Sequence, residues 1–371
     1  MRIATLQFAP ELGNVEANIR RADQLLKLTP GDVSDSPGIE ELRPDLLVLP
    51  EMAFSGYNFP TLEAIRPYLE VQNDGPSAEW AKKTASRLKC KVCVGYPEVS
   101  RNSTSTTESG SEKAETLYNS VILVDETGKF VHNYRKRFLY YTDEIWASEG
   151  EPEWSFKSLD FNTGPTKTDA HGLTLHVPTT FGICMDINPY KFEAPFTAWE
   201  FANRVLDSQS HLVILSTSWL VADASTVNSM PGQLPDMDTF NYWIRRFWPL
   251  IEKKIDYIKP LEGFSTPTEK NIVLIFANRS GFEDGANTIP DATYAGTSTI
   301  VTIAQKMVPD SQKEPEELQK DANAGSFEVK IHCWDIKGAR EEGICFADTT
   351  KEPKMTFVTK KRSDDDNDES E

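Results

Sequence analysis

The sequence lacks the long apolar run that a membrane-spanning helix requires. Its first residues, MRIATLQFAP, alternate like a strand and lack the basic, apolar and small-residue order of a secretory signal. Only five cysteines occur, an odd number that fits free thiols in a reducing compartment better than a disulfide framework. We therefore expect a soluble, cytoplasmic protein with no membrane contact, and leave open a minor mitochondrial or nuclear pool.

Positive charge is also scarce, because 39 Lys and Arg residues stand against 57 Asp and Glu residues, for a net charge of -18. This balance argues against nucleic acid as a partner, since phosphate binding needs a basic patch. Part of the negative charge lies in residues 361–371, which include the run SDDDNDESE. Like charges repel, so we expect a disordered acidic tail there, acting as a solubilising end rather than as a docking site.

Several common site motifs are missing as well. No G-x-S-x-G elbow, no phosphate loop ending in GK[ST] and no G-x-G-x-x-G after a strand is present. Cys90 and Cys93 have C-x-x-C spacing, but three positions apart in a strand they face opposite sides. The five histidines include no H-x-x-x-H pair. The sequence therefore favours neither a nucleotide site nor a serine hydrolase, and predicts no metal site.

The sequence does contain a regular alternation of strands and helices. The run PDLLVLPE has the length of a buried strand, and it is followed by SAEWAKKTASRLK as a helix and KVCVGYPE as the next strand. An earlier helix is expected in GNVEANIRRADQLLKL, with Asn14 as its cap. Residues 117–136 read as a hairpin whose turn uses Gly128. This is the pattern of an α/β fold.

We expect one domain over residues 1–360, because no linker separates two apolar cores. Residues 101–115, rich in Ser, Thr and Glu, read as a flexible insertion. The connection over residues 221–270 is too long for an ordinary loop, and its stretch FNYWIRRFWPLIEKK predicts an amphipathic helix.

Three residues with reactive side chains stand at the ends of expected strands: Glu51, Lys136 and Cys184. Strand ends are where α/β sheets place their sites. Each residue also has an ordinary structural interpretation: a solvated turn glutamate, a basic strand edge, and a small buried hydrophobe. A catalytic Cys184 would need a nearby cation or base that favours its thiolate.

The segments LLVLPEMAFSGY, YRKRFLYYTDEIW and FGICMDI, in this order, resemble the nitrilase, or carbon-nitrogen hydrolase, superfamily. The resemblance implies a four-layer α-β-β-α sandwich and a catalytic triad of Glu51, Lys136 and Cys184, with no cofactor. In this scheme Glu51 is the general base, and Lys136 keeps the Glu-Cys pair ionised and stabilises the developing oxyanion. By the same likeness, the backbone N–H of Met185 is the second oxyanion donor.

Within the superfamily, the flanking stretches YRKRFLYYTDEIWASEGEP and GICMDINPYKFEAPFTAWEFA resemble the fungal protein N-terminal amidases. The resemblance implies hydrolysis of N-terminal Asn and Gln of proteins and peptides to Asp and Glu, with ammonia released through a cysteine thioester, in N-degron processing. A small-molecule ω-amidase of the same superfamily is an alternative, and a noncatalytic interaction scaffold is a less favoured one. The preference between Asn and Gln and the oligomeric state are left open.

A peptide's first residue carries a free α-ammonium, which needs buried acceptors or carboxylates near the nucleophile. Asp186 and Glu144 are the candidates from sequence, although Asp186 could equally fix the turn and Glu144 could instead orient Lys136. Ser216 and Trp219 close an expected strand, where they would line the pocket or simply pack. Cys345 repeats the G-I-C letters in a charged C-terminal region, and we predict that it is noncatalytic.

Overall fold

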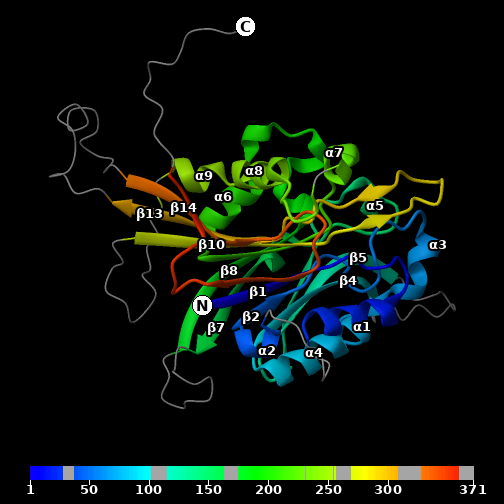
Figure 1. The fold of residues 1–371 in the computed structure, drawn as a ribbon. Helices are drawn as coiled ribbons and strands as arrows, with labels where there is room; N and C mark the ends of the chain where they lie inside the picture. The colour runs from blue at the N-terminus through cyan, green and yellow to red at the C-terminus, as the bar shows by residue number, and fades with distance from the viewer. Residues whose placement is uncertain are drawn as a thin grey trace, which may run out of the picture.

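Two seven-stranded sheets pack face to face, and helices cover the outer face of each (Figure 1). The computed structural model describes residues 1–27, 37–101, 115–162, 174–229, 231–253, 255, 269–307 and 327–358. This arrangement is the α-β-β-α sandwich expected from the sequence. No helix in the described ranges is both long and apolar enough to cross a membrane.

The first sheet has the strand order β15-β1-β2-β4-β5-β6, with β3 paired to β4. Neighbours β1, β2 and β4 are parallel, while β5 and β6 form the expected antiparallel hairpin. The bounds are β1 Arg2–Gln7, β2 Leu46–Val48, β3 Glu70–Val71, β4 Lys91–Arg101, β5 Glu115–Val124, β6 Phe130–Arg135 and β15 Gly343–Asp348.

The second sheet has the order β16-β14-β13-β10-β9-β8-β7, with β8, β9 and β10 parallel. The bounds are β7 Phe156–Asn162, β8 Thr174–Ile183, β9 Leu212–Thr217, β10 Glu269–Asn278, β13 Thr299–Met307, β14 Phe327–Ile336 and β16 Met355–Val358. A small separate pair is formed by β11 Phe282–Glu283 and β12 Ala292–Thr293.

Each outer helical layer covers one sheet. The first sheet is covered by α1 Val15–Leu25, α2 Ile39–Leu42 and α4 Pro76–Leu88, and the second by α6 Glu200–Asp207, α8 Met237–Arg246 and α9 Trp248–Glu252. The remaining helices are α3 Leu62–Ile65, α5 Tyr141–Glu144 and α7 Ala224–Ser229. Short 3₁₀ turns include η3 Cys184–Ile187 and η4 Tyr190–Phe192.

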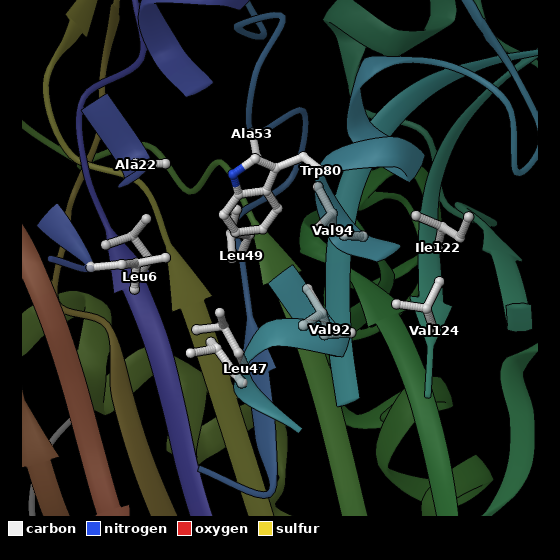
Figure 2. Packing of buried hydrophobic residues seen from close by; sticks show 14 of the residues in the cluster. Leu6, Ala22, Leu47, Leu49, Ala53, Trp80, Val92, Val94, Ile122 and Val124 are labelled. Atoms are coloured by element: carbon white, nitrogen blue, oxygen red, sulfur yellow. The ribbon is translucent and has the colours of Figure 1, made fainter. Parts of the chain in front are cut away.

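Strand β2 is apolar at every position because both of its faces are buried. In β2, Leu47 faces the layer under α4, where it packs in one cluster with Trp80 (Figure 2). Leu46 and Val48 point the other way, into the core between the two sheets. Successive side chains of a strand alternate between faces, so the continuous run LLV serves two apolar layers at once.

Two expectations about local structure need correction, and two others fall largely outside the described residues. Asn14 occupies the N-cap position of α1 but makes no capping hydrogen bond, because its side chain donates to Glu11 instead. The single helix expected in FNYWIRRFWPLIEKK is two helices, α8 and α9, since Pro249 has no N–H to continue the ladder. Residues 102–114 of the expected insertion and the acidic tail over 361–371 lie outside the described residues.

Candidate active site

Glu51 leaves the end of β2 and is completely buried. Its Oε1 accepts hydrogen bonds from Lys136 Nζ at 2.7 Å and Asn119 Nδ2 at 2.7 Å. Its Oε2 accepts the backbone N–H of Ser218 at 2.7 Å. A side chain at Gly95 of β4 would place its Cβ 2.6 Å from Glu51 Cα, so glycine there allows the turn to lie against the strand. Glu51 is therefore not the solvated turn residue that its type alone suggests.

Lys136 follows β6, and its ammonium lies between two buried carboxylates. Nζ donates to Glu51 at 2.7 Å and to Asp143 Oδ2 at 2.5 Å. Burial alone would lower the pKa of Lys136, but Asp143 and Glu51 outweigh it and hold that pKa above its ordinary value. Lys136 thus stays charged with its charge directed at the site, not at the solvent of a strand edge.

Asp143, in α5, is the residue that orients Lys136, and Glu144 does not. Asp143 is fully buried and also accepts from Tyr57 Oη at 3.2 Å and Asn119 Nδ2 at 2.9 Å. Glu144 is exposed and lines a neighbouring hollow of about 260 Å³. Within the single turn of α5, the Asp143 carboxylate is buried and the Glu144 side chain is exposed. Asp143 therefore takes the orienting role that was considered for Glu144.

One ammonium therefore serves two carboxylates in this buried cluster. Burial raises the pKa of Glu51, Lys136 lowers it and Asp143 raises it, with a net upward shift. A carboxylate with a raised pKa accepts a proton more readily than an ordinary glutamate. The cluster thus provides a base at Glu51.

Cys184 lies at the end of β8, where the chain turns sharply into η3. Its φ is +43°, an uncommon conformation for a residue other than glycine, and such backbone strain often marks functional positions. Burial raises the pKa of the Cys184 thiol, the charge of Glu51 raises it further, and Lys136 and the Ser218 N–H only partly oppose these effects. The surroundings therefore favour a neutral resting thiol beside a base, and the expected ionised Glu-Cys pair is not what the charges favour.

Asp186 fixes the turn, which decides between the two roles considered from the sequence. One carboxylate oxygen accepts the N–H of Phe138 at 2.8 Å, and the other accepts the N–H of Ile183 at 2.7 Å and Tyr134 Oη at 2.8 Å. Asp186 is 3 % exposed. Its acceptor capacity is used to tie the Cys184 turn to the segment after Lys136, so it is not the group that binds a substrate ammonium.

A cavity of about 400 Å³ opens beside Cys184. Its described walls are Tyr57, Tyr140, Cys184, Met185, Asn188, Phe192, Ser218, Trp219, Leu220, Ala222, Asp238, Thr239 and Tyr242. Aromatic and aliphatic groups dominate, with few polar groups among them, as in most small-molecule sites. Within the described ranges, no group of three His, Cys, Asp or Glu side chains is arranged to hold a metal ion.

The cavity includes Met185 and Trp219 as expected, but Ser218 takes the place proposed for Ser216. Ser216 Oγ donates to the carbonyl of Leu49 at 2.9 Å, so it joins the two sheets. Trp219 packs on Tyr242, with ring centroids 5.6 Å apart. Cys345 is fully buried in β15, away from the described cavity walls.

Asp143, Asn119, Ser218 and Asp238 were not identified from the sequence. Asp143 adjoins the chosen Glu144, and Ser218 lies two residues from the chosen Ser216, so alternation within the strand was the available signal for Ser218. Asp238 lies in the first turn of α8, within the long connection between β9 and β10, where no motif marks a site.

Comparison with known proteins points to the same superfamily that the motifs resemble. The Carbon-nitrogen hydrolase family model matches residues 2–163. The protein N-terminal amidase of Schizosaccharomyces pombe is 32 % identical over 318 residues, covering 82 % of this chain and 92 % of that protein. The protein N-terminal amidase of Saccharomyces cerevisiae is 31 % identical, covering 85 % of this chain and 89 % of that protein.

A crystal structure of an N-terminal amidase superposes with a TM-score of 0.67 at 23 % identity, covering 97 % of this chain and 98 % of the other. This structural likeness supports the fold, and the two yeast sequences show that the chain is related to them over most of its length. The protein belongs to the carbon-nitrogen hydrolase family, the nitrilase superfamily that its motifs resemble, and aligns over most of its length with protein N-terminal amidases.

Proposed function

We propose that this protein hydrolyses the side-chain amide of Asn or Gln at the N-terminus of peptides and proteins, giving Asp or Glu and ammonia. The observation that carries the proposal is the position of Cys184 in the wall of the cavity, with the Glu51–Lys136–Asp143 cluster buried behind it. The yeast protein N-terminal amidases that align over most of the chain support the same substrate class.

In the first half of the reaction, the Cys184 sulfur attacks the carbon of the substrate carboxamide, and Glu51 accepts the thiol proton. The neutral resting thiol makes this proton transfer part of the attack, and the raised pKa of Glu51 suits it to receive the proton. Lys136 and the Met185 N–H would stabilise the oxyanion. Collapse breaks the C–N bond, Glu51 returns the proton to the leaving nitrogen, and ammonia departs from a thioester.

In the second half, water attacks the thioester carbon while Glu51 accepts a proton from it. Collapse breaks the C–S bond, the proton returns to the sulfur, and the product is a carboxylic acid with Cys184 restored as a thiol. Ser218 supports both halves, because its N–H donates to Glu51 at 2.7 Å and also favours the negative charge on Cys184. Apart from the substrate and the attacking water, the groups in this cycle are side chains and backbone amides of the protein.

The cellular role that we propose is N-degron processing in the cytoplasm, where conversion of Asn or Gln changes the charge of a chain end. A second candidate is hydrolysis of a free ω-amide, since the 2-oxoglutaramate amidase of Bacillus subtilis is 27 % identical over 42 % of this chain. The coverage is about half that of the yeast amidases, which favours the peptide substrate.

Ammonia release distinguishes these functions. The purified protein is incubated with Asn-peptide, Gln-peptide, acetyl-Asn-peptide, free asparagine and 2-oxoglutaramate, with Cys184→Ala as the inactive control. We expect release from the two free-amine peptides and little from the other three compounds. Faster release from 2-oxoglutaramate than from either peptide would favour the small-molecule amidase, and the absence of release from all five compounds would overturn both enzyme proposals.

A further inference from the structure

Asp238 is the charged group of the cavity that the hydrolytic chemistry does not use. Of the thirteen residues that line the cavity, it is the one with a carboxylate. Asp186 and Asp143, by contrast, already accept hydrogen bonds from several protein donors on both carboxylate oxygens. Among the described residues, the Asp238 carboxylate has no hydrogen-bond or ion-pair partner given to it by the protein.

The position of Asp238 is set by the way α8 begins. Asp236 caps the helix, accepting the backbone N–H of Asp238 at 3.1 Å and the hydroxyl of Thr239 at 2.7 Å. On the opposite side of the helix, Phe240 and Trp243 are buried against the second sheet. A capped and anchored first turn holds the Asp238 carboxylate at the cavity wall.

On the same face, one turn further along α8, Tyr242 also lines the cavity. Its hydroxyl donates to Asn188 Oδ1 at 2.7 Å, and its ring packs on Trp219. Asp238 therefore lies beside aromatic surface whose faces also attract a cation. The side of the cavity formed by α8 is suited to a positive charge, while the side formed by η3 presents the nucleophile.

The proposed substrate brings such a charge into the cavity at a fixed distance. In Asn the α-nitrogen is three bonds from the amide carbon, and in Gln it is four, so the two lie within about 5 Å of each other. When the amide carbon contacts Cys184, the ammonium must therefore lie in the same, largely apolar cavity. An ammonium there needs a carboxylate or comparable acceptors to offset its lost hydration.

We propose that Asp238 accepts the α-ammonium of the substrate's first residue and is the residue that restricts the enzyme to free N-termini. This inference rests on the proposed function. An acetylated N-terminus would bring no charge and one donor fewer, so the exposed Asp238 carboxylate would form no ion pair with it. The restriction thus comes from α8, in the long connection between β9 and β10, and not from the catalytic cluster.

The test compares two substrates that differ only in the amine: an Asn-peptide and its succinamoyl analogue, which lacks the α-amino group. The variants are Asp238→Asn, which keeps the shape of the side chain, and Asp207→Asn, which removes an exposed charge at the end of α6. For Asp238→Asn we expect kcat/KM on the Asn-peptide to fall on the order of 10- to 100-fold, with less than about a threefold change on the analogue. Asp207→Asn should change neither value.

Equal losses on both substrates would mean that Asp238 only supports the shape of the site, and no loss on the Asn-peptide would mean that another group binds the amine. Either result would overturn the inference and leave the proposed function intact. Absence of ammonia release from the Asn-peptide by the wild-type protein would instead overturn the proposed function, and the inference with it. Asp238→Glu serves as the conservative variant, and it should retain more of the preference for the free amine than Asp238→Asn.

Discussion

Lys136 Nζ lies 2.5 Å from Asp143 Oδ2, so the ammonium that faces the nucleophile's base is held by a second buried carboxylate. Asp143→Asn should therefore lower kcat on the order of 100-fold with a smaller effect on KM, because Lys136 loses the partner that positions it. The exposed Asp207→Asn is the charge-matched control.

The pH profile separates this positioning role from a general loss of structure. The negative charge of Asp143 raises the pKa of Glu51, so its removal should lower that pKa. The acidic limb of kcat/KM in Asp143→Asn should then move to lower pH. If kcat/KM of Asp143→Asn reached a lower plateau but its acidic limb stayed at the wild-type pH, the role assigned to Asp143 would be contradicted.

Asp186→Asn should weaken the fold and the reaction together. The carboxylate accepts three backbone N–H groups and the Tyr134 hydroxyl around the Cys184 turn, and an amide cannot accept at its nitrogen. We expect a loss of about 1 to 3 kcal/mol in the free energy of unfolding, measured by urea denaturation. Activity should fall equally on Asn-peptide and on the succinamoyl analogue. A selective loss on the free-amine peptide would return the ammonium-binding role to Asp186.

Gly95→Ala should displace Glu51 through its backbone, without replacing any catalytic side chain. The new Cβ would lie 2.6 Å from Glu51 Cα and from the Pro50 carbonyl oxygen, so the turn or the strand must move. We expect a destabilisation of about 1 to 3 kcal/mol together with reduced kcat. Wild-type kcat in this variant, measured on a folded preparation, would show that the approach of Glu51 to β4 does not matter for catalysis.

Glu70 predicts a pH dependence of stability that is separate from catalysis. Burial raises its pKa from 4.5 to about 7, although it accepts the N–H and hydroxyl of Ser77 at the start of α4. The folded state thus binds the proton more tightly than the unfolded state. This contribution is fully present below pH 4.5 and is lost as the pH rises through 7.

Wild-type protein should therefore lose roughly 3 kcal/mol of unfolding free energy relative to Glu70→Gln between pH 4 and pH 8. Denaturation curves at both pH values measure this difference, and Asp207→Asn, which removes an exposed carboxylate at the end of α6, provides the control. Parallel stability profiles for wild type and Glu70→Gln would contradict it.

The sequence was sufficient for the layers and for the three residues that meet at the strand ends. Buried strands have continuous apolar runs, and the three residues lie just beyond strand ends: Lys136 and Cys184 directly follow β6 and β8, and Glu51 lies three residues after β2. The predictions that were wrong concern the direction in which single side chains point. Whether Asp143 or Glu144 faces inward follows from one short helical turn, which has no periodicity to read.

Asp238 illustrates a second limit. Its place in the cavity depends on how a long connection packs across the second sheet, and the break between α8 and α9 at Pro249 was itself missed. Contacts between segments so distant in the chain are set by tertiary packing and leave no local pattern in the sequence. The same holds for Asp186, whose partners come from two separate strands and the segment after Lys136.

The most direct test of the account is the mass of the protein during turnover. Wild-type protein is mixed with excess Asn-peptide, quenched in acid within the first turnover and measured by intact-protein mass spectrometry with peptide mapping. The account predicts an adduct equal to the peptide less ammonia, located on Cys184 and absent from Cys184→Ala, which should release no ammonia. Ammonia release at the wild-type rate by Cys184→Ala, or an adduct on a different residue, would contradict it.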